Sequence, residues 1–150
     1  MSNSEKAMDK EALSAIIIDF FERFSRWEEA MAEEAGLTPR QCHTVIKIGE
    51  TGRVQMKTLA ELLGITTGTL TILIGRLQKQ GLCSRVSDAS DKRVYHIELT
   101  PAGKAIYKKH KEQHSRLMEE IFARLSGEDC AILGKILEQL SVVLGGNQGN

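Results

Sequence analysis

Residues 56–81 of this 150-residue chain read MKTLAELLGITTGTLTILIGRLQKQG, and the pattern of their apolar residues indicates the fold class of the chain. Leucines and isoleucines recur three and four residues apart on both sides of Gly64, a spacing typical of amphipathic helices. Gly64 is expected to end the first segment and Gly81 the second, because glycine readily adopts the backbone conformation that terminates helices. The stretch therefore predicts two short helices, the second over 67–80, joined by a sharp turn.

The residues after Gly81 change from a helical period to alternation. Residues 82–86 (LCSRV) and 93–99 (RVYHIEL) predict two strands, with a polar turn at 87–92 (SDASDK) between them. Two helices followed by a two-stranded hairpin predict a winged helix-turn-helix. The side chains expected to form its small core are Leu59, Leu62, Leu63, Ile65, Leu70, Leu73, Ile74 and Leu77.

Helical patterns flank this segment on both sides. The helix expected over 9–35 carries more large apolar side chains than one small domain needs on one face, so part of it is expected to meet a second subunit. Thr38 and Gln41 form a predicted capping box with Pro39 at the first helical position, and Thr100 and Pro101 repeat this pattern. The remaining predicted segments are helices over 39–50, 101–125 and 129–144 and a disordered tail over 145–150.

Charge and cysteine content narrow the possible functions. Twenty basic and twenty acidic side chains cancel, so net charge alone predicts no polyanionic partner. Between Arg53 and Arg93, however, seven basic and three acidic residues give +4, which indicates a local basic patch. No apolar run is long enough to span a bilayer, and the first residues lack the layout of a signal peptide. Three scattered cysteines indicate free thiols in a reducing cytoplasm.

The start of the second short helix is expected to expose small hydroxyl side chains and bare backbone. Such groups suit the phosphates and base edges of a DNA major groove, and a cationic hairpin tip suits an adjacent minor groove. The alternative is a solvated hairpin beside a threonine-rich core helix, but the order of helix, turn, helix and wing favours DNA binding. The residues expected to contact DNA are Thr66, Thr67, Gly68, Thr69, Thr71 and Arg76 on the helix, and Lys92 and Arg93 on the wing.

Three stretches of the chain resemble the MarR family of bacterial transcriptional regulators. They are LTPRQCHTVIKI at 37–48, TLAELLGITTGTLTILIGRLQKQGL at 58–82 and DASDKRVYHIELTPAGK at 88–104. The resemblance implies a homodimer that binds a palindromic DNA operator, usually as a repressor. On the wing it implies that Asp91 orients Arg93.

The fold class expected from these observations is mainly α with a small β-hairpin wing, in a single domain over 1–150. By resemblance, the winged helix-turn-helix over 37–99 binds DNA, and the helices at 9–35 and 101–144 form the dimer. The chain departs from the family at Ile72 and Gly75, where a basic and an acidic residue are frequent.

The sequence YKKHKEQHSR places His110 and His114 four residues apart on one face of a predicted helix. Two imidazoles at this spacing can take two corners of a tetrahedral zinc site. The chain is also similar to the zinc-sensing subgroup of this family, whose metal-binding histidines match His43, His110 and His114. The resemblance implies a zinc or other divalent-metal effector at the junction of the DNA-binding and dimerisation regions. Cys42 or Glu28 is expected to supply the fourth ligand, because thiolates and carboxylates bind zinc.

The chain departs from that subgroup at Cys42, Met31 and Ser25. The subgroup has different residues, which are metal ligands, at these three positions. One metal ion is therefore expected in this chain rather than two. The alternative for a lysine-flanked histidine pair is an ordinary solvated surface, and His96 is expected to be structural. Other effectors stay open. An oxidant acting on Cys42 is one, because a cysteine in the first turn of a helix beside a histidine favours a thiolate. An organic acid or drug-like molecule is another.

Catalysis is the least favoured function. The chain has no Ser-His-Asp order, phosphate-binding glycine loop or H-E-x-x-H motif. A metal with four protein ligands would also lack the open position that a zinc enzyme needs. The sequence therefore predicts a cytoplasmic regulator rather than an enzyme.

Overall fold

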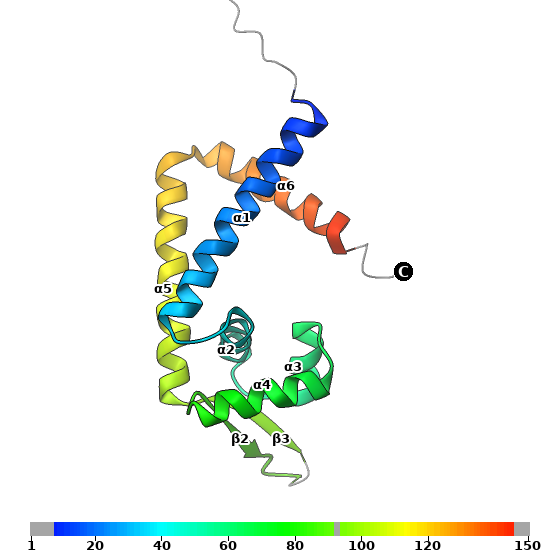
Figure 1. Ribbon diagram of the computed structural model, residues 1–150, viewed down its shortest axis with the longest axis vertical. Helices are drawn as coiled ribbons and strands as arrows, with labels where there is room; N and C mark the ends of the chain where they lie inside the picture. The colour runs from blue at the N-terminus through cyan, green and yellow to red at the C-terminus, as the bar shows by residue number, and fades with distance from the viewer. Residues whose placement is uncertain (1–7, 92–93, 146–150) are drawn as a thin grey trace, which may run out of the picture. The chain divides into compact units, whose positions relative to one another are not determined.

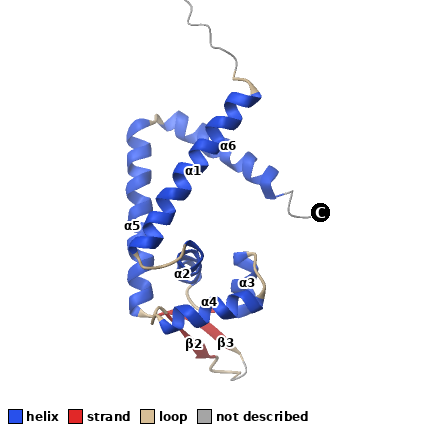
Figure 2. Cartoon of the chain, in the orientation of Figure 1, coloured by secondary structure: helices blue, strands red, loops and turns tan. Residues whose placement is uncertain are grey.

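A computed structural model of the chain describes residues 8–91 and 94–145. Helices dominate it, and its strands belong to one small sheet (Figures 1 and 2). The elements are α1 (Lys10–Glu34), α2 (Pro39–Thr51), β1 (Val54–Gln55), α3 (Met56–Leu63), α4 (Thr67–Lys79), β2 (Cys83–Ser87), β3 (Tyr95–Leu99), α5 (Pro101–Arg124) and α6 (Gly127–Gly145). The predicted order of helices and the wing is confirmed.

The chain divides into two compact units, residues 1–107 and 108–150, with the boundary inside α5. The first unit contains the hydrophobic core. Its fully buried side chains include Leu59 from α3 and Ile97 from β3. From α4 it buries Leu70, Ile74 and Leu77. The helix-turn-helix and the sheet therefore share one core.

One predicted core residue is wrong: Leu62 is 48% exposed. Leu59 and Ala60 are the residues that α3 buries, and Leu63 is half-buried against the same core. Leu62 lies on a different face of this eight-residue helix, because successive residues of an α-helix point in different directions. A leucine-rich short helix has more apolar residues than its buried face can hold.

The turn between α3 and α4 is closed by local hydrogen bonds. Gly64 has φ 61° and ψ 34°, a left-handed conformation that favours glycine. Its amide donates to Glu61 O at 3.1 Å, and the amide of Ile65 donates to Ala60 O at 3.1 Å. Thr66 then caps α4 by accepting from the amide of Thr69. The two helices bend by 104° here, as the expected sharp turn requires.

The wing is a three-stranded antiparallel sheet in the order β1-β3-β2, rather than the predicted two-stranded hairpin. Val54 pairs with Ile97 and Gln55 with His96, so the segment before α3, where no strand was predicted, adds a third one. A two-residue strand has no detectable alternation of its own. Its conformation depends on a partner strand that lies far along the chain.

The start of α5 is tied to the sheet at a close backbone approach. Thr100 donates from its amide to Leu82 O at 3.1 Å and from its hydroxyl to Gly81 O at 2.6 Å. The amide of Gly103 donates to Thr100 Oγ1, which confirms Thr100 as the N-cap. A Cβ on Gly103 would overlap the carbonyl oxygen of Leu82. Glycine is therefore required here by packing.

The capping box predicted at the start of α2 is confirmed. Gln41 N donates to Thr38 Oγ1 at 3.2 Å, and Thr38 N donates to Gln41 Oε1 at 2.9 Å. The end of α1 contacts this part of the core through Ala32, which is 1% exposed. Met31 is buried beside it. The last turn of α1 thus belongs to the folded first unit.

The second unit contains the later turns of α5 and the whole of α6. Ser126 and Asp129 cap α6 reciprocally, with Asp129 N donating to Ser126 Oγ at 3.1 Å and Ser126 N donating to Asp129 Oδ2 at 3.3 Å. None of the residues of α6 is buried in the chain taken alone. Among residues 8–91 and 94–145, no single helix is long and apolar enough to cross a membrane, and α3 and α4 pass that test only as a sharply bent pair.

Candidate nucleic-acid interface

Helix α4 places one face in the core and the other in solvent. Leu70, Leu73, Ile74 and Leu77 are buried. The predicted contact residues Thr66, Thr67, Gly68, Thr71 and Arg76 are exposed, and Thr69 is half-buried. The second helix of the helix-turn-helix therefore carries its predicted residues mainly on a surface that a DNA duplex can reach.

The hydroxyl groups of α4 are held by contacts inside the helix. Thr66 Oγ1 accepts from Thr69 N at 3.2 Å and shares a hydrogen bond with Thr69 Oγ1 at 3.0 Å. Thr71 Oγ1 donates to Thr67 O at 2.8 Å. These bonds fix the side-chain rotamers of the first turn.

The turn of the wing is organised around Asp88, a residue that sequence analysis did not select. Asp88 Oδ1 accepts from Ser90 N at 2.8 Å, from Ser90 Oγ at 2.5 Å and from Asp91 N at 3.3 Å. Its own amide donates to Val94 O at 2.8 Å. Asp-x-Ser in a polar turn was the available signal, since aspartate commonly accepts from the amide two residues later.

His96 joins this arrangement from β3. Its Nδ1 lies 3.8 Å from Asp88 Oδ2, so the two groups form an ion pair when the imidazole is protonated. The structural role expected for His96 agrees with this position in the sheet. Asp91 is exposed in the same turn, and its carbonyl accepts from Val94 N at 3.0 Å. The predicted contacts Lys92 and Arg93 lie outside the described residues, so the orientation of Arg93 by Asp91 stays a prediction.

The contribution of Asp88 to the turn is expected to disappear in acid. The hydrogen bond from the Ser90 hydroxyl, followed by those from the amides of Ser90 and Asp91, lowers the pKa of Asp88 from its ordinary value of 3.8. A lowered carboxyl pKa stabilises the folded turn fully above the ordinary value, and this contribution is lost as the pH falls through the lowered one. Amide shifts of Ser90 and Asp91 in an NMR titration should therefore move below pH 3.8. A transition of these amide shifts above pH 3.8 would contradict a lowered pKa for Asp88. The variant Asp88→Asn should show no such transition.

The predicted metal ligands fall in different surroundings. The rings of His110 and His114 lie together on α5, with centroids 4.4 Å apart and planes 36° from parallel. Both histidines are half-buried. On α2, His43 is exposed, whereas the neighbouring Cys42 is 6% exposed and belongs to the hydrophobic core. Glu28 is exposed on α1. The two imidazoles on α5 are thus neighbours, and imidazole is a residue type that binds zinc.

The expected thiolate at Cys42 is wrong. Burial, with a smaller contribution from the negative charge of Glu28, raises the pKa of the Cys42 thiol. The first turn of a helix favours a thiolate only where the sulfur remains near solvent or a cation, and the core provides neither. Burial also raises the pKa of Cys83 to about 11.

Thiol reactivity should follow this burial. Cys130 is half-buried on α6, whereas Cys42 and Cys83 are buried. At mildly alkaline pH, a disulfide thiol reagent is expected to modify Cys130 first. Cys42 and Cys83 should react only when the protein is unfolded. Mass spectrometry of the modified peptides checks the order, and modification of Cys42 in the native protein at the rate of Cys130 would revive the oxidant-sensing alternative.

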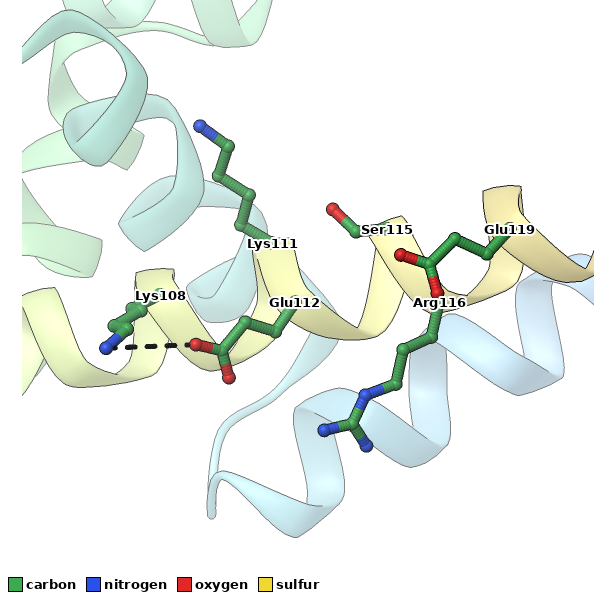
Figure 3. A pocket seen from close by; sticks show the side chains of 6 residues that line it. All are labelled: Lys108, Lys111, Glu112, Ser115, Arg116 and Glu119. Carbon is green, nitrogen blue, oxygen red and sulfur yellow. Dashed lines mark ion pairs between the residues drawn. The ribbon is translucent and has the colours of Figure 1, made fainter.

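A shallow hollow of about 480 Å³ lies along α5, lined by Lys108, Lys111, Glu112, Ser115, Arg116 and Glu119. Figure 3 shows that all six side chains come from this one helix. Lys108 Nζ and Glu112 Oε1 are 3.8 Å apart, so charges of opposite sign already meet within the hollow. A row of such residues on a single helix is typical of a solvated surface.

A second hollow, of about 410 Å³, lies in the first unit where α2, the sheet and α5 meet. Within this hollow Arg53 forms an ion pair with Glu98 of β3, and the distance between Arg53 Nη2 and Glu98 Oε2 is 3.1 Å. Tyr107 packs so closely on Gly49 that a Cβ there would overlap its ring. The residues that line this hollow are Ile48, Gly49, Gly52, Arg53, Glu98, Leu99, Lys104 and Tyr107. This hollow was not predictable from the sequence, because its wall is formed by residues from separate segments of the chain.

Comparison with known proteins identifies the family. Residues 37–95 match the model of the MarR family. The chain is 31% identical over 104 residues to the uncharacterised HTH-type transcriptional regulator YsmB of Bacillus subtilis, covering 69% of this chain and 71% of that protein. It is 26% identical to the HTH-type transcriptional regulator FarR of Neisseria gonorrhoeae, covering 73% and 75%.

A solved structure extends the similarity over nearly the whole chain. FabT of Streptococcus pneumoniae, crystallised in complex with DNA, is 28% identical, with a TM-score of 0.83 over 92% of this chain and 99% of that one. These relatives are transcriptional regulators rather than enzymes. The fold, the exposed α4 face and the matches agree, and the chain belongs to the MarR family of DNA-binding transcriptional regulators.

Proposed function

We propose that this protein is a cytoplasmic repressor that binds a palindromic operator through α4 and the wing. The observation that carries this proposal is the exposed face of α4, whose opposite face is anchored in the core by Leu70, Ile74 and Leu77. A rigid helix supported in this way can enter a major groove without rearranging. FabT, which has the same fold, was crystallised in complex with DNA, and this supports DNA binding by the present chain.

The operator can be found by selecting duplexes from a randomised pool with the full-length protein. The enriched sequences should be palindromic with half-sites about one helical turn apart, since two equivalent recognition helices then face the same side of DNA. Affinity should fall steeply with salt, because phosphate contacts release counterions. Failure to enrich any duplex at low salt, with or without metal, would reject the proposal.

A homodimer is part of this proposal. Large apolar side chains stay exposed on both terminal helices, including Phe20 (61%) and Phe21 (67%) on α1 and Val143 (65%) on α6. A monomer rarely exposes so many apolar groups without an interaction partner. Sedimentation equilibrium should give twice the chain mass of 16.6 kDa. Phe21→Glu should shift the protein toward monomer, whereas an exposed polar change such as Glu22→Gln should leave it dimeric.

We also propose that a divalent metal, zinc first, is the effector. The support is the pair His110 and His114, whose rings are 4.4 Å apart on α5. His43 would supply a third imidazole, as in the zinc-sensing subgroup that the sequence resembles. The burial of Cys42 favours Glu28 over Cys42 as the fourth ligand. When bound, the metal would supply a link between helices that changes operator affinity.

The metal proposal is tested with four matched histidine variants. Zinc content after purification without chelator, and affinity for the selected operator with and without zinc, are measured for each. His43→Ala, His110→Ala and His114→Ala should lower zinc content and remove the metal dependence. His96→Ala is the control, since His96 belongs to the wing and should leave the zinc content unchanged. Equal zinc in all variants would reject the site.

An organic acid is the second candidate effector, and the hollow of about 410 Å³ in the first unit favours it. Arg53 is already paired with Glu98 in this hollow, so Lys104 supplies the positive charge, and Tyr107 and Leu99 supply apolar surface, which together suit an aromatic carboxylate. A thermal shift with a panel of aromatic acids, compared between wild type and Lys104→Ala, tests it. Equal shifts in both proteins would exclude this hollow as the binding site.

A further inference from the structure

The exposed face of α4 lacks the side chains that read base edges through paired hydrogen bonds. Residues 66–75 read TTGTLTILIG and contain no Arg, Lys, Asn, Gln, Asp or Glu. Recognition of guanine by two hydrogen bonds needs Arg or Lys, and that of adenine needs Asn or Gln. Arg76 lies in the last turn of α4. The first two turns must discriminate bases by another kind of contact.

The hydroxyl groups on this face have limited capacity for a base. A hydroxyl carries a single donor hydrogen. Thr71 already donates it to Thr67 O, at 2.8 Å. The hydroxyls of Thr66 and Thr69 are hydrogen-bonded to each other at 3.0 Å. Thr71 can therefore accept from a base but not donate, and one of the two donor hydrogens of Thr66 and Thr69 is already used, so these three hydroxyls offer a base few donors.

Ile72 is a large apolar side chain on the exposed face of α4, and it is 60% exposed. Of its four neighbours three and four positions away along the helix, two are the glycines Gly68 and Gly75, and the other two are Thr69 and Arg76. A Cβ on Gly75 would meet nothing within 4 Å, and one on Gly68 would meet only the Thr66 hydroxyl at 3.9 Å. Neither glycine is required by packing inside the chain.

We propose that Ile72 contacts the 5-methyl groups of thymines, so that α4 discriminates bases mainly by apolar contact. This inference rests on the proposed DNA binding. The thymine methyl is the apolar group that the major groove displays, and apolar side chains recognise it by contact. The absent side chains at Gly68 and Gly75 let the helix backbone approach the groove and bring Ile72 against the base edges. Each operator half-site then carries a thymine at the position facing Ile72.

The test removes the methyl group from the DNA and the side chain from the protein. In the selected operator, each symmetric pair of thymines is replaced by deoxyuridine, which differs only in lacking the 5-methyl. Binding of full-length protein is measured by fluorescence anisotropy. For one pair, wild-type affinity should fall about 15-fold, since each buried methyl is worth roughly fourfold. Ile72→Ala should bind the thymine and uracil duplexes equally, and Ile72→Val should keep part of the difference.

Leu62→Ala is the matched control, because Leu62 is an exposed apolar residue on α3. This variant should keep the wild-type preference for thymine over uracil. Tight operator binding without any such preference would overturn the inference and leave the DNA-binding function intact. An unchanged preference in Ile72→Ala would overturn it as well, because the methyl contact would then belong to another residue. Failure to enrich any duplex would remove the DNA-binding function and the inference together.

Discussion

Replacing Gly68 by glutamate is expected to weaken operator binding by roughly 100-fold without unfolding the protein. Gly68 lies in the exposed first turn of α4, and a Cβ there would meet only the Thr66 hydroxyl at 3.9 Å. A carboxylate in the first turn favours the helix itself, because it faces the positive end of the helix dipole. Against DNA the same charge faces phosphates, and a like-charge contact of about 3 kcal/mol corresponds to roughly 100-fold in Kd.

Gly68→Gln separates charge from size in this experiment. Glutamine has nearly the same shape as glutamate but no charge, so it should bind at least ten times more tightly than Gly68→Glu at low salt. The difference between the two variants should shrink as salt is added, because salt screens exposed charges. Thermal unfolding should show both variants folded. Equal loss of affinity in the two variants would show that side-chain volume, not charge, is excluded from this surface.

Replacing Gly103 by alanine is expected to destabilise the first unit by about 3 kcal/mol or more. The added Cβ would overlap the carbonyl oxygen of Leu82 and approach Leu99 Cδ2 at 3.1 Å. Leu82 O already accepts the amide of Thr100 at 3.1 Å, so moving it also disturbs the junction between the sheet and α5. The obstacle is backbone, which cannot turn aside as a flexible side chain can. Urea unfolding followed by circular dichroism measures the loss.

Gly75→Ala is the control for this stability measurement. Gly75 also lies inside a helix, but a Cβ there would meet nothing within 4 Å. Alanine has the higher helix propensity, so this variant should be more stable by up to about 1 kcal/mol. Opposite signs at the two glycines are therefore expected. A loss below about 1 kcal/mol in Gly103→Ala would contradict the tight approach between α5 and Leu82.

The helix boundaries followed from short-range chemistry that the sequence displays. Thr38, Thr66 and Thr100 each accept an amide hydrogen bond from the residue three positions later. Gly64 has the left-handed conformation expected of a residue that ends a helix. A hydrogen bond between residues three apart, or one backbone angle, depends on few neighbours. These features were therefore predictable without the fold.

Contacts between distant segments were not predictable in this way. Strand β1 exists because Val54 pairs with Ile97, which lies more than forty residues later in the chain. The pairing of Asp88 with His96 likewise depends on the register of β2 and β3. A two-residue strand and a single aspartate carry no periodic signal. The predicted wing accordingly had one strand fewer, and no role was predicted for Asp88.

The candidate site shows the same division between local pattern and tertiary packing. Spacing alone placed His110 and His114 side by side, because residues four apart share a helix face. Spacing also put Thr67, Gly68, Thr71 and Ile72 into one predicted helix. The same spacing put Ile74 into the predicted core and left Ile72 out of it, and the structure confirms this, because Ile74 is fully buried and Ile72 is 60% exposed. Both are isoleucines, and the difference is which side of α4 meets the core.

Cys42 and His43 are adjacent in the sequence, yet the fold places their side chains in different environments. Both were expected to hold a metal, because the sequence shows residue types that bind zinc. In the folded chain Cys42 packs in the core, where its thiol pKa is raised, and His43 is exposed. Residue type and helical spacing are properties of the chain itself. Burial and pKa depend on surrounding atoms from other segments, so the tertiary structure had to decide them.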